Sequence, residues 1–134
     1  MSTATGYTLS ATTVLPFADA VERVRAELQE EGFGVLCDVD VQATLREKLG
    51  VEQEPYTILG ACNPPLAHQA LSAEPELGTL LPCNVVVYRN DGETHISAID
   101  AERMLSLVEN PELATVAAQV RAKLSSVVER ASSR

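Results

Sequence analysis

The sequence predicts a single α+β domain, a sandwich of helices packed against a mixed or antiparallel sheet. Segments with strand-like alternation and segments with helical periodicity interleave in the first half of the chain, and a hairpin signal followed by helices occupies the second half. With 134 residues and 46% hydrophobic content, the chain can bury a core without metals or disulfides. We therefore expect one domain over residues 1–134.

The first strand and the first helix are predicted from a change in hydrophobic period. Residues 7–14 alternate enough to form a strand. Pro16 then begins a helix with an apolar stripe at steps of four, three and four residues: Phe17, Val21, Val24 and Leu28. Gly32 ends this helix, because glycine readily adopts the conformation found just past a helical C-terminus.

Residues 33–39 form the second predicted strand. Alternate side chains share one face of it: Phe33, Val35, Cys37 and Val39. Cys37 is therefore expected in the core. Asp40 is a plausible N-cap for a short helix that carries Leu45 and Leu49 and ends at Gly50.

The third predicted strand, residues 56–62, runs directly into Asn63 and Pro64. Asparagine caps helix N-termini and proline suits the first helical position, so this pair indicates a helix start. The buried side of that helix is expected to carry Leu66, Ala67, Ala70 and Leu71.

A hairpin is predicted next, since residues 84–89 and 93–99 flank an Asp-Gly step at Asp91 and Gly92. Asp100 then caps a helix with three apolar side chains: Met104, Leu105 and Val108. Asn110 and Pro111 repeat the cap-plus-proline signal for a last helix that extends to about residue 130. Its apolar stripe is Leu113, Val116, Ala117, Val120, Leu124, Val127 and Val128.

The charge balance excludes two classes of partner. The formal net charge is −9, and no cluster of Lys or Arg interrupts the excess of acidic side chains. Nucleic-acid binding needs a basic surface that displaces counterions, and anionic membranes repel an acidic protein. We therefore expect neither nucleic acid nor membrane as a partner.

Cellular location is predicted from what the chain lacks. No apolar run reaches the ~20 residues that span a bilayer, and the first residues do not resemble a signal peptide. Three cysteines, an odd number, fit reduced thiols better than a disulfide framework. These features favour the cytoplasm.

Cys62 is the most informative position for chemistry. It directly precedes the predicted helix start at Asn63, where free backbone N–H groups and the helix dipole favour an anion. A thiolate is such an anion, and this environment lowers the pKa of a cysteine. A purely structural interpretation stands beside this one, because buried free cysteine is common at the end of a strand.

Cys83 follows Pro82 at the start of the next strand, and an intervening helix and loop can return it to Cys62 at one end of the sheet. The amides of Asn63 and Asn84 adjoin the two cysteines as candidate binding groups, although capping alone explains Asn63. His68 lies just off the apolar side of the helix after Cys62, where it is either a base or third ligand, or a half-exposed surface histidine.

Two runs of sequence resemble the signature of the DUF302 family of domains of unknown function. They extend over residues 56–71 and 78–87, and each contains a Cys-Asn step. The family pattern carries over onto Cys62, Asn63, Pro64, His68, Pro82, Cys83 and Asn84. The resemblance implies a strongly curved, mostly antiparallel sheet with helices on one face, similar to the TATA-box-binding-protein fold, and assembly as a homodimer. It implies no reaction.

Three hypotheses about function follow. The first is a binding site in which Cys62 and Cys83, alone or with His68, hold a soft metal ion such as Zn or Cu(I), or a sulfur-containing small molecule. The second is a structural or protein-interaction homodimer in which the cysteines only pack. The third is a redox or sulfur-transfer enzyme with Cys62 as nucleophile, His68 as base and Cys83 as resolving thiol.

Overall fold

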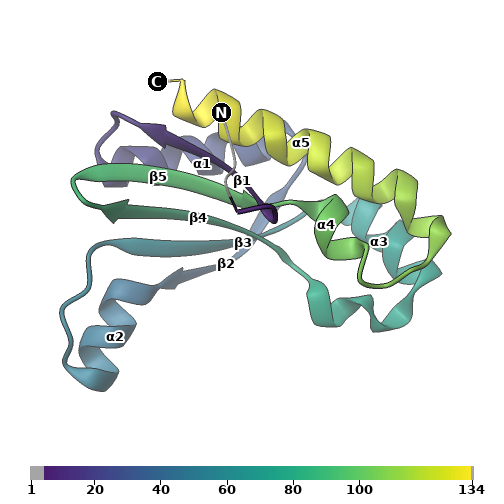
Figure 1. The fold of residues 1–134 in the computed structure, drawn as a ribbon, viewed down its shortest axis with the longest axis horizontal. Helices are drawn as coiled ribbons and strands as arrows, with labels where there is room; N and C mark the ends of the chain where they lie inside the picture. The colour runs from purple at the N-terminus through teal and green to yellow at the C-terminus, as the bar shows by residue number, and fades with distance from the viewer. Residues whose placement is uncertain (1–4, 134) are drawn as a thin grey trace.

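The computed structural model describes residues 5–133, and these residues contain a sheet of five strands that is antiparallel throughout (Figure 1). The strands are β1 (Thr8–Thr13), β2 (Gly34–Asp40), β3 (Tyr56–Cys62), β4 (Cys83–Asn90) and β5 (Glu93–Ile99). Their order across the sheet is β1-β5-β4-β3-β2. The predicted α+β class is confirmed, and the sheet is antiparallel rather than mixed.

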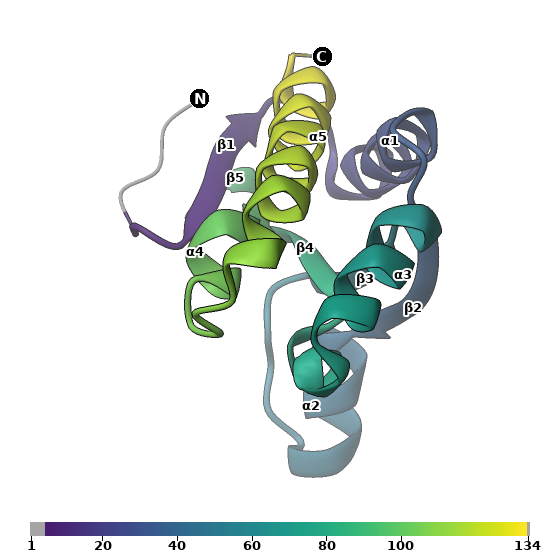
Figure 2. The ribbon, with the colours of Figure 1, turned by 90° about the vertical axis from the view of Figure 1, so that its right-hand side faces the viewer.

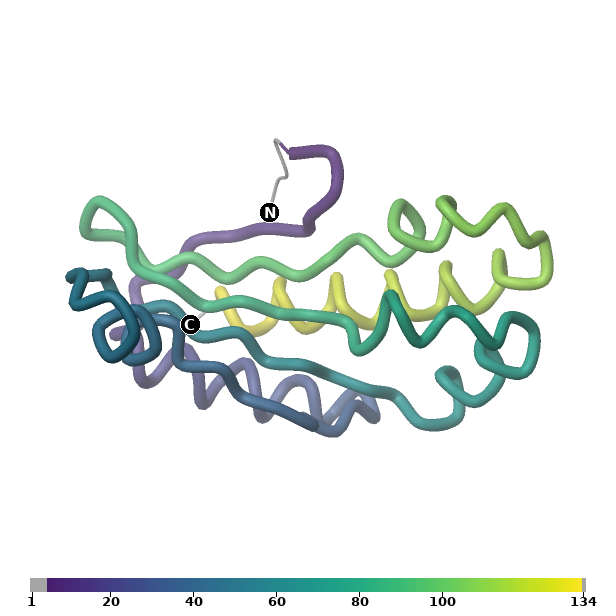
Figure 3. Tube along the Cα trace, turned by 90° about the horizontal axis from the view of Figure 1, so that it is seen from below, coloured from purple at the N-terminus to yellow at the C-terminus, as the bar shows by residue number. Residues whose placement is uncertain are grey.

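Most of the helices cover one face of this sheet, and the centre of the other face is left open (Figures 1 and 3). The helices are α1 (Phe17–Glu30), α2 (Val41–Leu49), α3 (Pro64–Ala73), α4 (Ala101–Leu105) and α5 (Ala114–Ser132), with 3-10 turns η1 (Pro75–Leu80) and η2 (Pro111–Leu113). Helices α1, α3 and α5 lie together on the covered face, whereas α2 projects from the end of β2 (Figures 1 and 2). Within the described residues, no helix is both long and apolar enough to cross a membrane.

The core lies between the covered face and helices α1 and α5. Fully buried side chains from both layers meet there: Val24, Leu28, Leu59, Val85, Val87, Ile96, Leu124, Val127 and Val128. The apolar stripes predicted for the first and last helices supply five of these nine side chains. Hydrophobic burial on this scale is the main stabilising term of such a domain.

Helix starts agree with the capping residues expected from the sequence. The carboxylate of Asp40 accepts a hydrogen bond from Ala43 N, and Asp100 accepts from Glu102 N and Arg103 N. Asn110 accepts from Glu112 N, although the first turn after it is the 3-10 turn η2 and α5 begins only at Ala114.

The prediction that Cys37 lies in the core is wrong. The pairing of β2 with β3 shifts between Val35 and Cys37, where a β-bulge at Leu36 breaks the alternation of side chains. Phe33 is buried, but Cys37 is exposed. Its Sγ lies over Gly60, only 2.5 Å from where a Cβ on that residue would be.

Candidate functional site

The two cysteine segments meet where β3 ends and β4 begins. Ala61 of β3 pairs with Cys83 of β4, so Cys62 lies one residue beyond this pair. Both cysteines line a cavity of about 280 Å³ between this end of the sheet and the helices that cover it. The segments that line it come from five places in the chain, and their main apolar side chains are Phe33, Leu66, Leu77, Met104, Leu105 and Val120.

The lining of this cavity, which we call the cysteine cavity, carries no charged side chain among the described residues. Its sulfur atoms are those of Cys62, Cys83 and Met104. Burying an isolated charge in such surroundings is costly, whereas apolar groups and polarisable sulfur fit them. The cavity therefore suits a neutral, mainly apolar molecule.

Burial sets the protonation state of Cys83. The side chain is 7% exposed, and desolvation, with a smaller contribution from Cys62 nearby, raises the pKa of its thiol to about 11. At neutral pH Cys83 is therefore an uncharged thiol and a weak hydrogen-bond donor. Cys62 is half-buried at the N-terminal end of α3.

Asn63 fixes the position of that helix end. Its Oδ1 accepts a hydrogen bond from Leu66 N at 3.3 Å, which confirms the predicted cap. Its Nδ2 donates to the carbonyl of Glu31 at 3.3 Å and so ties α3 to the end of α1. The residue lines the cysteine cavity, but both ends of its amide already have partners within the chain.

His68 and Asn84 lie away from the cysteine cavity. His68 is exposed on α3, because the positions of this helix that face the cavity are Leu66, Ala67, Ala70 and Leu71. Asn84 follows Cys83 on a strand, so its side chain points to the opposite, uncovered face of the sheet. The structure thus brings together Cys62, Asn63 and Cys83, and it separates His68 and Asn84 from them.

A three-ligand metal site is not assembled. Among residues 5–133, no group of three or more His, Cys, Asp or Glu side chains is placed to hold a metal ion. The expected set of Cys62, Cys83 and His68 fails because the imidazole lies on the outer side of α3. The two thiols remain as a pair inside an apolar cavity.

Sequence reasoning missed most of the apolar wall. The sequence pattern predicts Met104 and Leu105 on the buried side of a helix, but it gives no link between them and the cysteines. No helical or strand pattern places Leu77 of η1, although it is 1% exposed. Its apolar neighbours in the segment before Cys83 were the available signal, but no local rule says which residues a return loop will contact.

Fold and site together define a small α+β domain with a two-thiol cavity at one end of its sheet. Residues 7–131 match the family model described as Domain of unknown function DUF302, and the chain belongs to this family. A solved structure described as an uncharacterised conserved DUF302 protein from Bacillus stearothermophilus is similar, with a TM-score of 0.87 and 30% sequence identity. The match covers 92% of this chain and 97% of that one. No curated protein matches the chain.

Proposed function

We propose that the protein binds a small, uncharged, sulfur-containing molecule in the cysteine cavity. The observation that carries the proposal is a mainly apolar cavity of about 280 Å³ whose lining includes three sulfur atoms, two from thiols and one from a thioether. This volume is near the lower limit of ligand pockets, which begin at roughly 300 Å³. Polarisable sulfur makes favourable contacts with other soft groups.

The protonation of Cys83 favours this ligand over a soft metal ion. Metal ligation requires the thiolate, and burial stabilises the neutral thiol of this residue instead. A neutral molecule needs no loss of a proton. The enzymatic hypothesis is weakened in the same way, because His68 is not placed as a base and Cys83 is protonated.

Matched probes test the proposal. We expect a short dialkyl thioether to slow alkylation of Cys62 and Cys83 in the reduced protein more than the ether of the same length. Cys83→Ala should reduce this preference for sulfur while leaving the fold intact, and Cys62→Ser provides the second arm. Equal protection by thioether and ether, or none by either, would contradict the proposal.

The metal hypothesis has its own measurement. Cu(I) is titrated into the reduced protein and into the Cys62→Ser and Cys83→Ser variants. Equal, weak uptake by all three is the result that we expect. Stoichiometric uptake that disappears in both variants would contradict the proposal and identify a soft metal ion as the ligand.

The uncovered face of the sheet supports a second candidate function, homodimer assembly. In its centre, strands β3, β4 and β5 present Tyr56, Ile58, Val86, Tyr88, His95 and Ser97, and none of these is an acid, a lysine or an arginine. The rings of Tyr56 and Tyr88 stack at 5.1 Å, and those of Tyr88 and His95 at 4.8 Å. Two copies that each carry a net charge of −9 repel least where a face has no acidic side chain at its centre.

Sedimentation tests this assembly. We expect the protein to sediment as a dimer and Val86→Asp to sediment as a folded monomer, because the substitution places a carboxylate in the centre of the face. Val86→Thr, which has similar volume and no charge, should remain dimeric. A wild-type protein that is monomeric at high concentration would rule out this candidate.

A further inference from the structure

A second hollow, of about 450 Å³, lies on the other side of α4 from the cysteine cavity. Its lining combines the apolar side chains of Leu113 and Ala117 with the carboxylate residues Glu102 and Glu109. Among the described residues, Leu105 is the one that lines both spaces, and it is 7% exposed. This leucine therefore belongs to the wall between the cysteine cavity and the second hollow, and it is the residue of that wall that contacts both spaces.

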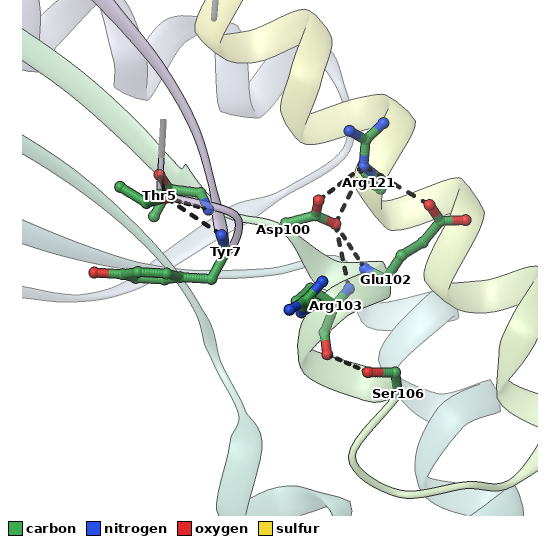
Figure 4. A network of polar contacts seen from close by, with 8 residues as sticks. Thr5, Tyr7, Asp100, Glu102, Arg103, Ser106 and Arg121 are labelled. Carbon is green, nitrogen blue, oxygen red and sulfur yellow. Dashed lines mark hydrogen bonds and ion pairs between the residues drawn. The ribbon is translucent and has the colours of Figure 1, made fainter. Parts of the chain in front are cut away.

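Polar contacts hold this wall in place at the start of α4. The carboxylate of Asp100 caps the helix and also accepts hydrogen bonds from Arg121 Nε, which lies 3.1 Å from each carboxylate oxygen (Figure 4). Arg121 belongs to α5, so this contact joins α4 to the longest helix of the domain.

A second contact anchors the other end of the segment. Asn110 Nδ2 donates to the carbonyl of Ala73 at 3.3 Å and to Glu74 Oε1 at 3.1 Å, both at the end of α3. The chain between Asp100 and Asn110 is thus tied to α5 at one end and to α3 at the other. Leu105 lies between these two contacts, and 7% of its surface is exposed.

We propose that Leu105 sets the maximum length of the molecule that the cysteine cavity accepts. This inference rests on the proposed function and names its ligand class, an unbranched apolar chain with a sulfur group near Cys62 and Cys83. Such a chain runs from the cysteines toward α4 and ends against the leucine. Beyond it, the apolar side chains of Leu113 and Ala117 would accept more of the chain if the wall were removed.

The physical expectation is a break in the dependence of affinity on chain length. Each additional buried methylene raises affinity about fourfold, because removing its apolar surface from water contributes ~0.8 kcal/mol to binding. A methylene that would overlap Leu105 adds no affinity, because fitting it against a close-packed side chain strains the protein or the ligand. The series should therefore rise and then level at one length.

The experiment titrates the reduced protein with n-alkyl methyl sulfides of increasing length and measures affinity by calorimetry. We expect Leu105→Ala to extend the rising part of the series by at least two methylenes. The control Leu113→Ala, which enlarges only the second hollow, should level where the wild type does. Leu105→Phe should level earlier, and it covers the case in which the alanine variant does not fold.

The outcomes separate this inference from the proposed function. If the wild type binds no sulfide of any length, the proposed function itself fails. If short sulfides bind and both Leu105→Ala and Leu105→Phe level at the wild-type length, the cysteine cavity stands and the role of Leu105 is overturned.

Discussion

At the scale of single residues, the buried thiol of Cys83 couples the site to stability. Its pKa is raised to about 11 from an ordinary value of 9.0, mainly by desolvation. The folded state therefore holds the proton more tightly than the unfolded chain does. Folding stability is complete below about pH 9 and falls as the pH rises toward 11, where the unfolded thiol has ionised and the folded one has not.

We expect this loss to be about 2–3 kcal/mol across the shift, following ~1.4 kcal/mol for each pKa unit. Urea unfolding at pH 8 and pH 10.5 measures it as a difference between the wild type and Cys83→Ala. Other groups that ionise in this range, Tyr56 among them, contribute to both proteins and cancel. A wild type and variant that lose the same stability would contradict the assignment.

Gly60 is required for packing on the uncovered face. A Cβ there would lie 2.5 Å from Cys37 Sγ and 2.9 Å from Pro82 Cγ. Gly60→Ala should destabilise the protein by about 1–3 kcal/mol, the usual cost of overpacking. Adding Cys37→Ala should recover part of this, because it removes the nearest atom, and a double-mutant cycle in urea measures the coupling. Strictly additive effects would mean that the two side chains do not interact.

At the scale of elements, the end of β5 and the start of α4 depend on Asp100. Its side chain is 17% exposed and serves both as a helix cap and as the partner of Arg121. Local signals were sufficient to find this cap, as they were for Asp40 and Asn63, because a cap and its helix are neighbours in sequence. The bulge at Leu36 has no such local signal, so alternation placed Cys37 on the wrong face.

Asp100→Ala should destabilise the protein by about 1–2 kcal/mol through loss of the cap. Arg121→Gln keeps the cap and should cost less than ~1 kcal/mol, because the guanidinium is partly exposed and exposed ion pairs contribute little. Thermal unfolding of both variants provides the comparison. An arginine variant as unstable as the aspartate variant would show that the contact with α5, rather than the cap, holds α4.

At the scale of the whole molecule, the site exists because of the strand order. Helix α1 connects β1 to β2, and these two strands lie at opposite edges of the sheet. Strands β3 and β4 are therefore adjacent within it. This adjacency brings Cys62 and Cys83 together, as their positions at strand ends led us to expect. The helix count and the cysteine pair were predictable from local patterns and loop lengths.

The cavity itself was not predictable in that way. Its walls come from Phe33, α3, η1, α4 and α5, and their contacts are set by how the helices pack on the sheet. The same packing excludes His68, which lies only one position away from Ala67 on the cavity side of α3. Side-chain direction on a helix changes by ~100° for each residue, so a boundary position cannot be assigned until the packing is known.

The central claim is that a neutral sulfur compound occupies the cysteine cavity, and the methyl group of Met104 reports it most directly. The chain has two methionines, so labelling the methionine methyl groups gives a spectrum in which one signal belongs to a residue that lines the cavity. Titration with methyl propyl sulfide should shift the Met104 signal saturably in the wild type and more weakly in Cys83→Ala. A Met104 signal that does not move at saturating sulfide would contradict the account.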